Sequence, residues 1–204
     1  MSYGGGKKFV AVKSQWIQPR VICNTTETRK SSFWVGLDGY GSPTVEQIGT
    51  EAMCGGYSDP HYYAWWEMYP ALSQPIDMEI HPGDAMAAEV TSGGCNFAMT
   101  LKNVTTGASF STTQADCSAQ KASAEVIAEA PSPCGGCGPY HLANFGTICF
   151  HDSYITNASV TGSFTNPAWT SDAITMTQVN GNVKAQPSAL NSVGRMFSIT
   201  WLHY

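Results

Sequence analysis

The sequence of 204 residues has few charged side chains and no cluster of one sign. Asp, Glu, Lys and Arg make up 12% of the chain, about half of the usual share of roughly 25%. The net charge is −5, and the basic pairs Lys7-Lys8 and Arg29-Lys30 are isolated. A chain without a basic stripe is unlike proteins that bind nucleic acid, so no such partner is expected. In strong acid it carries only fifteen positive side chains, ten Lys and Arg and five His, which limits self-repulsion.

Long apolar runs and helical periods are also missing. No stretch of 18 apolar residues occurs, so we expect no membrane span. The start, MSYGGGKKFVAV, lacks the apolar core and cleavage site of a secretory signal. No long segment shows a 3.6-residue apolar period with caps, so the sequence does not favour amphipathic helices.

Cysteine is plentiful for a chain of this size. Seven cysteines and three Asn-X-Ser/Thr sequons, at Asn24, Asn103 and Asn157, indicate an oxidising compartment and a secreted protein. The pair Cys134 and Cys137 has metal-ligand spacing, but a structural zinc site needs a second pair of similar spacing, and the sequence has none. We expect one or two disulfides, a leftover thiol, and no metal or cofactor.

Short apolar runs separated by Gly, Pro, Asn and Asp predict an all-β chain. The strands are expected over residues 9–12, 32–37, 62–69, 76–80, 85–90, 97–101, 108–112, 122–129, 146–151, 173–179 and 197–203. Turns are expected at 82–84 and 105–107, and Asn180-Gly181 is a strong hairpin signal. This spacing predicts an antiparallel β-sandwich of two packed, curved sheets, of the jelly-roll or concanavalin A-like type. We expect one domain over residues 1–204, monomeric, with a flexible end at 1–7 and a long loop at 130–140.

Two segments carry candidate site residues. On a strand over residues 122–129, Glu125 and Glu129 share one face about 13 Å apart, while the other face is small and apolar. The segment YYAWWEMYP, Tyr62–Pro70, packs aromatic residues around Glu67. Those aromatics fit either the core or a surface that binds peptides or sugars.

These segments resemble the glutamic peptidases, or eqolisins. Trp34-Val35-Gly36-Leu37-Asp38-Gly39 resembles their WVGIDG strand, and Val45–Gly49 resembles the segment with the catalytic glutamine. Tyr62–Pro70 resembles the YxAWYEWYP signature, and residues 124–129, AEVIAE, resemble AEWIVE with its catalytic glutamate. The chain departs from the family pattern where Glu46 replaces an apolar residue, Val126 a tryptophan and Met68 an aromatic residue.

The resemblance implies a two-sheet fold with the active site on a concave face, and an acid endopeptidase acting on polypeptides. It implies Gln47 and Glu125 as the catalytic pair, with these side chains as substrate-binding or supporting residues: Trp34, Asp38, Glu51, Tyr62, Trp65 and Glu67. Glu125 would act as general base on water and then as general acid, and the Gln47 amide would stabilise the oxyanion. Acid operation follows if Glu125 stays ionised near its unperturbed pKa of about 4.3 or lower.

Two other functions stay open at this point, and so does a degenerate relative that has kept the fold and lost the activity. A lectin-like sandwich would use the aromatics without depending on Glu125. A glycosidase would place Glu67 and Glu125 about 5–9 Å apart on facing strands. The sequence has no Asp-Thr-Gly pair, no HExxH and no G-x-S-x-G, so it lacks the signatures of aspartic, zinc and serine hydrolases.

Overall fold

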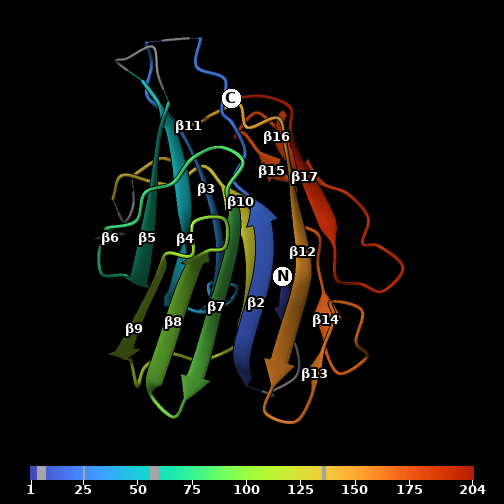
Figure 1. The fold of residues 1–204 in the computed structure, drawn as a ribbon. Helices are drawn as coiled ribbons and strands as arrows, with labels where there is room; N and C mark the ends of the chain where they lie inside the picture. Colours follow the sequence, from blue (N-terminus) through green and yellow to red (C-terminus); the bar gives the residue numbers. More distant parts are fainter. Residues whose placement is uncertain (4–7, 25, 56–59, 135–136) are drawn as a thin grey trace.

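The computed structural model describes residues 1–3, 8–24, 26–55, 60–134 and 137–204. These residues form two antiparallel sheets packed face to face, which confirms the predicted β-sandwich (Figure 1). The described part of the chain contains no helix, and hence none that could cross a membrane.

The first sheet carries the candidate site. Its strand order is β14-β1-β10-β3-β4-β5-β6, and the short β11 pairs with β3. The strands are β1 (Ser2–Tyr3), β3 (Arg29–Asp38), β4 (Val45–Cys54), β5 (His61–Tyr69), β6 (Gln74–Ile76), β10 (Ser123–Glu129), β11 (His141–Leu142) and β14 (Thr170–Ser171).

The second sheet backs the first. Its order is β15-β16-β17-β12-β2-β7-β8-β9, and β13 pairs with β12. The strands are β2 (Phe9–Ile17), β7 (Ala85–Gly93), β8 (Asn96–Asn103), β9 (Ser109–Ala115), β12 (Thr147–Asn157), β13 (Thr161–Gly162), β15 (Met176–Thr177), β16 (Val183–Pro187) and β17 (Phe197–Trp201).

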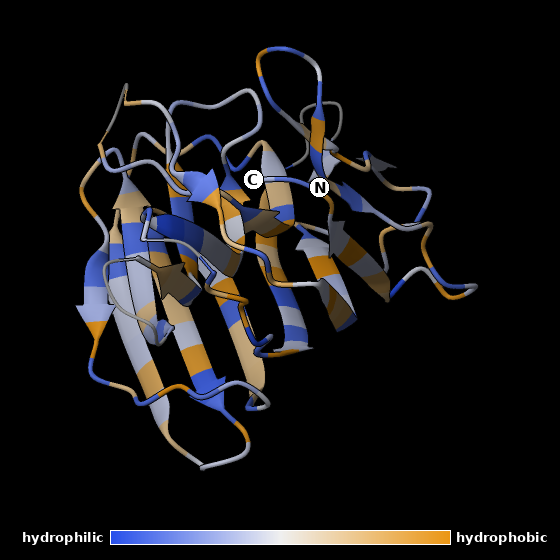
Figure 2. Cartoon of the chain, turned by 90° about the horizontal axis from the view of Figure 1, so that it is seen from above, coloured by the Kyte–Doolittle hydropathy of each residue, from blue (hydrophilic) through white to orange (hydrophobic). Residues whose placement is uncertain are grey.

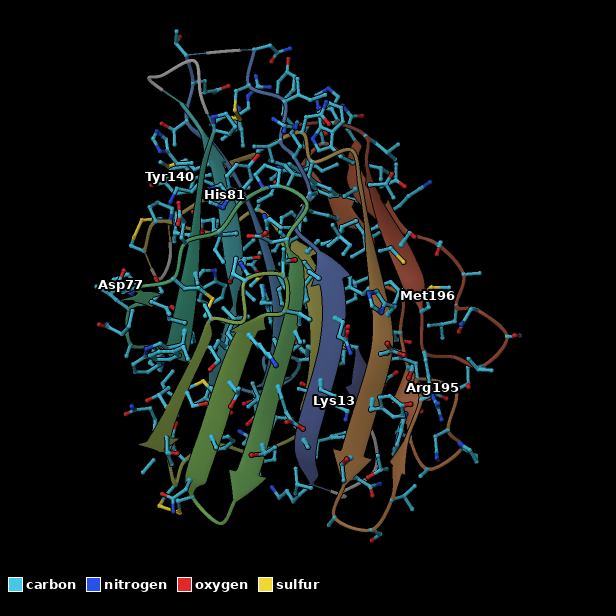
Figure 3. The ribbon with its side chains drawn as sticks, in the orientation of Figure 1. Lys13, Asp77, His81, Tyr140, Arg195 and Met196 are labelled. Atoms are coloured by element: carbon cyan, nitrogen blue, oxygen red, sulfur yellow. A yellow bond between two sulfur atoms is a disulfide. The ribbon has the colours of Figure 1, made fainter. Side chains whose placement is uncertain are left out.

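The core lies between the sheets because alternate residues of each strand point inward. The banding of apolar and polar residues along the strands is visible in Figure 2. Val35 and Ile48 of the first sheet and Val90 and Met99 of the second are fully buried. On the outer face of the second sheet, Lys13 lies 5.1 Å from the Tyr154 ring centroid (Figure 3). The second sheet therefore has one apolar and one polar face.

The structure corrects several boundaries. Strand β4 was not predicted, because the glutamates 46 and 51 fall on opposite faces and hide the period-2 pattern. Only Gln74–Ile76 and Met176–Thr177 are strands within or near the stretches predicted at 76–80 and 173–179. The hairpin at Asn180-Gly181 is confirmed by the pairing of β15 with β16. Ser2 and Tyr3 form β1 instead of a flexible end, and residues 4–7 lie outside the described residues.

Three disulfides form instead of one or two, and Cys149 stays free. They join Cys23 to Cys54, Cys95 to Cys117 and Cys134 to Cys137. The pair with metal-ligand spacing is therefore a disulfide inside the long loop that precedes β11.

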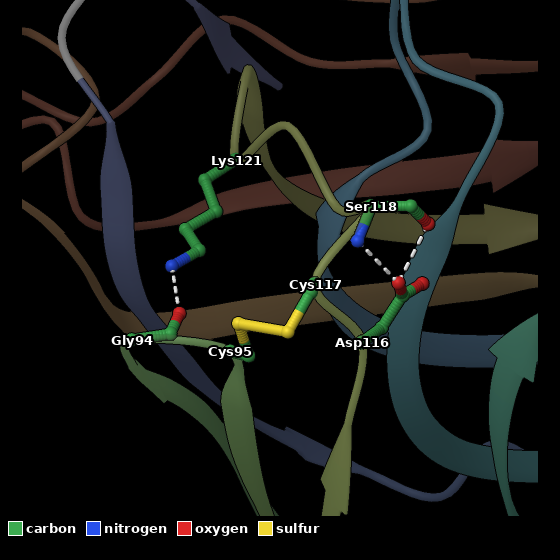
Figure 4. Close-up of a disulfide and its surroundings, with 6 residues drawn as sticks. All are labelled: Gly94, Cys95, Asp116, Cys117, Ser118 and Lys121. Atoms are coloured by element: carbon green, nitrogen blue, oxygen red, sulfur yellow. Dashed lines mark hydrogen bonds between the residues drawn. A yellow bond between two sulfur atoms is a disulfide. The ribbon is translucent and has the colours of Figure 1, made fainter.

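The connection from β9 to β10 passes from the second sheet to the first and is fastened at both ends. The disulfide Cys95–Cys117 ties its start to the β7–β8 turn, and the Lys121 ammonium donates to the Gly94 carbonyl (Figure 4). At its other end, the Asp38 carboxylate accepts the backbone N–H groups of Lys121 and Ala122, each at 2.7 Å. These contacts fix the chain just before β10, which begins two residues before Glu125.

Candidate active site

Glu125 and Gln47 lie in one row that crosses four strands of the first sheet. Glu125 on β10 pairs with Gly36 on β3, Gly36 with Gln47 on β4, and Gln47 with Glu67 on β5. Residues paired across adjacent strands share a face, so three side chains rise from the same side around Gly36. The sequence-predicted pair is therefore brought together on one face.

Gly36 allows a close approach of side chains over the backbone between Glu125 and Gln47. A Cβ added to Gly36 would lie 2.9 Å from Cζ3 of Trp34 and 3.1 Å from Cβ of Gln47. Any larger residue would therefore push Trp34 or Gln47 from its place. The glycine of the WVG segment therefore has a structural reason, which is the close approach of Trp34 and Gln47.

Glu125 is almost completely buried, with 5% of its surface exposed. Burial raises the pKa of its carboxyl to about 7, and the hydrogen bond from Ser123 opposes that rise. The Ser123 hydroxyl lies 3.1 Å from Oε1 of Glu125 and 2.7 Å from the carbonyl oxygen of Asp38. Gly39 passes so close that a Cβ on it would lie 3.0 Å from Oε2. The condition of a pKa near 4.3 or lower is therefore not met in the protein without substrate, because desolvation outweighs the donors.

The amide nitrogen of Gln47 is bound to Glu67, and its carbonyl oxygen has no partner among the described residues. Its Nε2 donates to Oε2 of Glu67 at 2.5 Å. Burial raises the pKa of Glu67, and this amide donor lowers it. The carbonyl oxygen of Gln47 and the indole N–H of Trp65 are both buried without a partner among the described residues. Unpaired buried polar groups are costly, so these two are suited to a water molecule or substrate.

A further carboxyl group, on Glu129, belongs to the same face. Trp34 Nε1 donates to its Oε2 at 3.2 Å. Burial raises the pKa of Glu129 to about 7, and the charges of Glu67, Glu125 and Glu51 add to that rise. Glu129 was absent from the predicted site residues, although its spacing of four from Glu125 on a strand was a usable signal.

Glu51 anchors a polar cluster one step further along the strands. Its carboxylate pairs with Lys30 at 2.7 Å and accepts hydrogen bonds from the Ser32 and Tyr63 hydroxyls. Tyr140, on the loop before β11, contributes its ring 4.9 Å from the Lys30 ammonium (Figure 3). Because each of its oxygens is engaged, Glu51 supports this end of the groove and has no free oxygen for chemistry.

Two of the predicted site residues, Asp38 and Tyr62, make their contacts outside the row. Asp38 is completely buried and uses its carboxylate on the backbone of Lys121 and Ala122, so it acts on the position of β10. Tyr62 points to the opposite face of β5, where it packs against the core and accepts the Val21 N–H at 3.0 Å. Side chains alternate along a strand, so its neighbour Tyr63 faces the site instead.

Two cavities flank the row. One, of about 420 Å³, lies over β4 and β5 and is lined by polar groups that include Gln47, Glu51 and Glu67. The other, of about 320 Å³, lies beside β10 and is lined by Glu125 and mostly apolar side chains. Together they give a binding region on both sides of the space above Gly36.

Comparison with known proteins decides the family. The model of the peptidase A4 family matches residues 2–195. This chain belongs to that family, the glutamic peptidases or eqolisins. It is accordingly a peptidase. No match was found among curated proteins.

Solved structures of glutamic peptidases share the fold. Scytalido-glutamic peptidase with a transition state analog inhibitor has 23% identity and a TM-score of 0.82, covering 98% of this chain and 96% of that one. Aspergilloglutamic peptidase from Aspergillus niger has 24% identity and a TM-score of 0.73, covering 85% and 99%. SCP-B, an eqolisin in complex with the tripeptide Ala-Ile-His, has 22% identity and a TM-score of 0.75, covering 98% and 96%. At these identities the likeness shows the β-sandwich of the A4 peptidases.

Proposed function

We propose that this peptidase is an endopeptidase in which Glu125 and Gln47 are the catalytic pair. The observation that carries the proposal is their common row, on either side of a glycine that places no side chain between them. A carboxyl group and a neutral amide that face one space suit the two main tasks of peptide hydrolysis, which are moving a proton and stabilising an oxyanion.

In the proposed reaction, a water molecule first lies between the side chains of Glu125 and Gln47. Ionised Glu125 takes a proton from this water as it attacks the scissile carbonyl carbon, and a C–O bond forms. The Gln47 amide donates to the oxyanion, a contribution of about 3–4 kcal/mol. Glu125 then gives the proton to the departing nitrogen, and the C–N bond breaks. The amide cannot change charge with pH, so its role holds throughout the working range.

The raised pKa of Glu125 constrains this order of events. With a pKa of about 7, only about one carboxyl group in a hundred is ionised two pH units lower. Operation in acid therefore requires further donors to this carboxylate in the substrate complex. We propose that Gln47 supplies one. Its amide now donates to Glu67, and protonation of Glu67 in acid removes the anion that holds it.

The two-carboxylate glycosidase is disfavoured by the sheet order. Two strands, β3 and β4, separate Glu125 from Glu67. Three strand spacings place their backbones about 14 Å apart, and Gln47 lies between the two glutamates in the row. Membership of the peptidase A4 family favours peptide hydrolysis over the lectin and glycosidase functions.

We further propose that the enzyme is secreted and works as a monomer on polypeptides. The three disulfides support an oxidising compartment. Sedimentation of the oxidised protein tests the monomer directly.

The experiment for the catalytic pair is cleavage of a denatured protein well below neutral pH. The wild type is compared with Glu125→Gln and Gln47→Ala, and with the exposed matched controls Glu79→Gln and Gln186→Ala. We expect cleavage by the wild type and both controls, loss with Glu125→Gln, and a fall of about 10²–10³ with Gln47→Ala. Full cleavage by the Glu125→Gln protein would overturn the proposal.

A further inference from the structure

The cavity beside β10 reaches the catalytic row from one side only. It begins at Trp34, Glu125 and Ile127 on the site face and continues past the edge of β10 to Phe197 in the core. Its outer wall comes from the C-terminal segment, where Ile174 and Leu190 line it. Two chain segments far apart in the sequence thus build one space that ends at the Glu125 carboxyl group.

The cavity exists because β10 lacks a full neighbour. Strand β1 pairs with β10 only at Ser123 and Ala124. Beyond that point, residues 125–129 have no strand on their outer side among the described residues. The C-terminal segment lies over this gap without pairing to the strand, and it leaves about 320 Å³ between them.

The residues that line the cavity beside β10 favour an apolar group as its occupant. Apart from the carboxyl groups of Glu125, Glu129 and Asp172 and the amino group of Met1, the walls are mainly aliphatic and aromatic. An apolar group would be buried there, which is favourable in proportion to the area removed from water. The volume is at the lower end of the range for ligand sites, so it suits one large side chain better than an extended ligand.

The cavity on the other side of the row is more polar, although Trp65, Leu72 and three prolines also line it. Lys30, Glu51 and Glu67 line it, with hydroxyl groups between them. An apolar side chain there would displace water from charged groups without replacing their hydrogen bonds. A peptide that lies across the row would therefore meet an apolar cavity on one side of the row and a more polar cavity on the other.

We infer that the cavity beside β10 is the specificity pocket of the enzyme, and that it seats a large apolar side chain of the substrate next to the cleaved bond. This inference rests on the proposed function, because it assumes that the reacting carbonyl lies at Glu125. Ile174 and Leu190 determine the preference, although neither lies on the sheet that carries the catalytic pair.

The test uses a peptide series in which one Phe is moved along an otherwise small, polar sequence, with Ala as reference. We expect one position where Phe raises kcat/KM by about 10- to 100-fold. Ile174→Trp fills the cavity at a site that is 49% exposed, so folding is not at risk. It should bring kcat/KM for the Phe and Ala peptides to about the same value, and Leu190→Ala should weaken the preference.

The matched control is Ile22→Trp, at an isoleucine that is 56% exposed and does not line the cavity. It should keep the preference. Calorimetry on the Glu125→Gln protein measures binding of the same peptides without turnover, and the Phe peptide should bind at least tenfold tighter than the Ala peptide. Equal binding, or a preference that survives Ile174→Trp, overturns the inference even if no peptide is cleaved. Absence of cleavage with selective binding would instead overturn the proposed function alone.

Discussion

Glu125 and Gln47 are two strands apart in one sheet, and the residue between them is the side-chain-free Gly36. The relationship makes the space above Gly36 the centre of the site. Its size is set by Trp34 and Gln47, which lie within about van der Waals distance of where a Cβ would be.

Substituting Gly36 with alanine should therefore block the site. The added methyl would displace Gln47 or Trp34, and misplacement of a catalytic group by about 1 Å costs about 100-fold in rate. We expect kcat/KM of Gly36→Ala to fall at least tenfold while circular dichroism stays that of a folded β-protein. Gly93→Ala on β7, where a Cβ meets nothing within 4 Å, is the matched control. Unchanged activity in Gly36→Ala would show that this space is not used.

Ser123 should tune the working pH through Glu125. Its hydroxyl lies 3.1 Å from Oε1 of Glu125 and lowers the pKa that burial raises to about 7. Ser123→Ala removes that donor, so the pKa should rise further. If Glu125 acts as a base, kcat increases with pH through the pKa of this carboxyl group in the substrate complex. The acid limb of that pH profile should move to higher pH in the variant. A limb that stays in place would mean that another group controls it.

Glu46 should make the protein less stable as pH rises. It is fully buried on the core side of β4, and neither carboxyl oxygen has a partner among the described residues. Burial raises its pKa from 4.5 to about 8. Below about pH 4.5 the group is protonated in the folded and unfolded states, so it contributes nothing. Between these values only the unfolded state loses the proton, so the free energy of unfolding falls as pH rises.

Urea denaturation of the wild type and Glu46→Gln between pH 4 and 8 measures this effect. We expect nearly equal stability at the acid end and a growing advantage of the variant toward pH 8, with an upper limit of about 5 kcal/mol. Glu79→Gln, at an exposed carboxyl group, should show no such trend. Parallel pH curves for wild type and Glu46→Gln would contradict the assignment.

The disulfide Cys95–Cys117 should stabilise the fold through the connection that leads into β10. It closes a loop with a sequence separation of 22, and the loop-entropy relation gives about 3 kcal/mol for that length. Replacing both cysteines with serine should lower the free energy of unfolding by about this amount in chemical denaturation. Cys149→Ser, at the free thiol, is the control and should have little effect. A double variant as stable as the wild type would exclude this role.

Much of the fold was predictable because period-2 alternation and turn residues are local signals. The faces of β10 were predicted correctly, since the small apolar residues Ala124, Val126 and Ala128 alternate with its carboxylates. Strand β4 was missed because Glu46 points into the core, where a carboxylate is not expected. A single sequence does not show which buried position tolerates such a group.

The closeness of the proposed catalytic pair was predictable, and the electrostatics of Glu125 were less so. The ordered motifs placed Gln47 and Glu125 together, but the pKa of Glu125 depends on desolvation by residues distant in the chain. Tyr62 was chosen over Tyr63 because a motif does not state which face of a strand meets the groove. The cavity beside β10 depends on how the C-terminal segment lies against the edge of that strand, and no local pattern encodes that contact.

The most direct test of the account is a double-mutant cycle on peptide hydrolysis with Glu125→Gln, Gln47→Ala and the protein that carries both changes. If the two side chains act on one water molecule, the double variant should be no slower than Glu125→Gln alone, because groups that act as a unit are strongly non-additive. Losses that simply add would show that the two residues contribute independently, and would contradict the shared site.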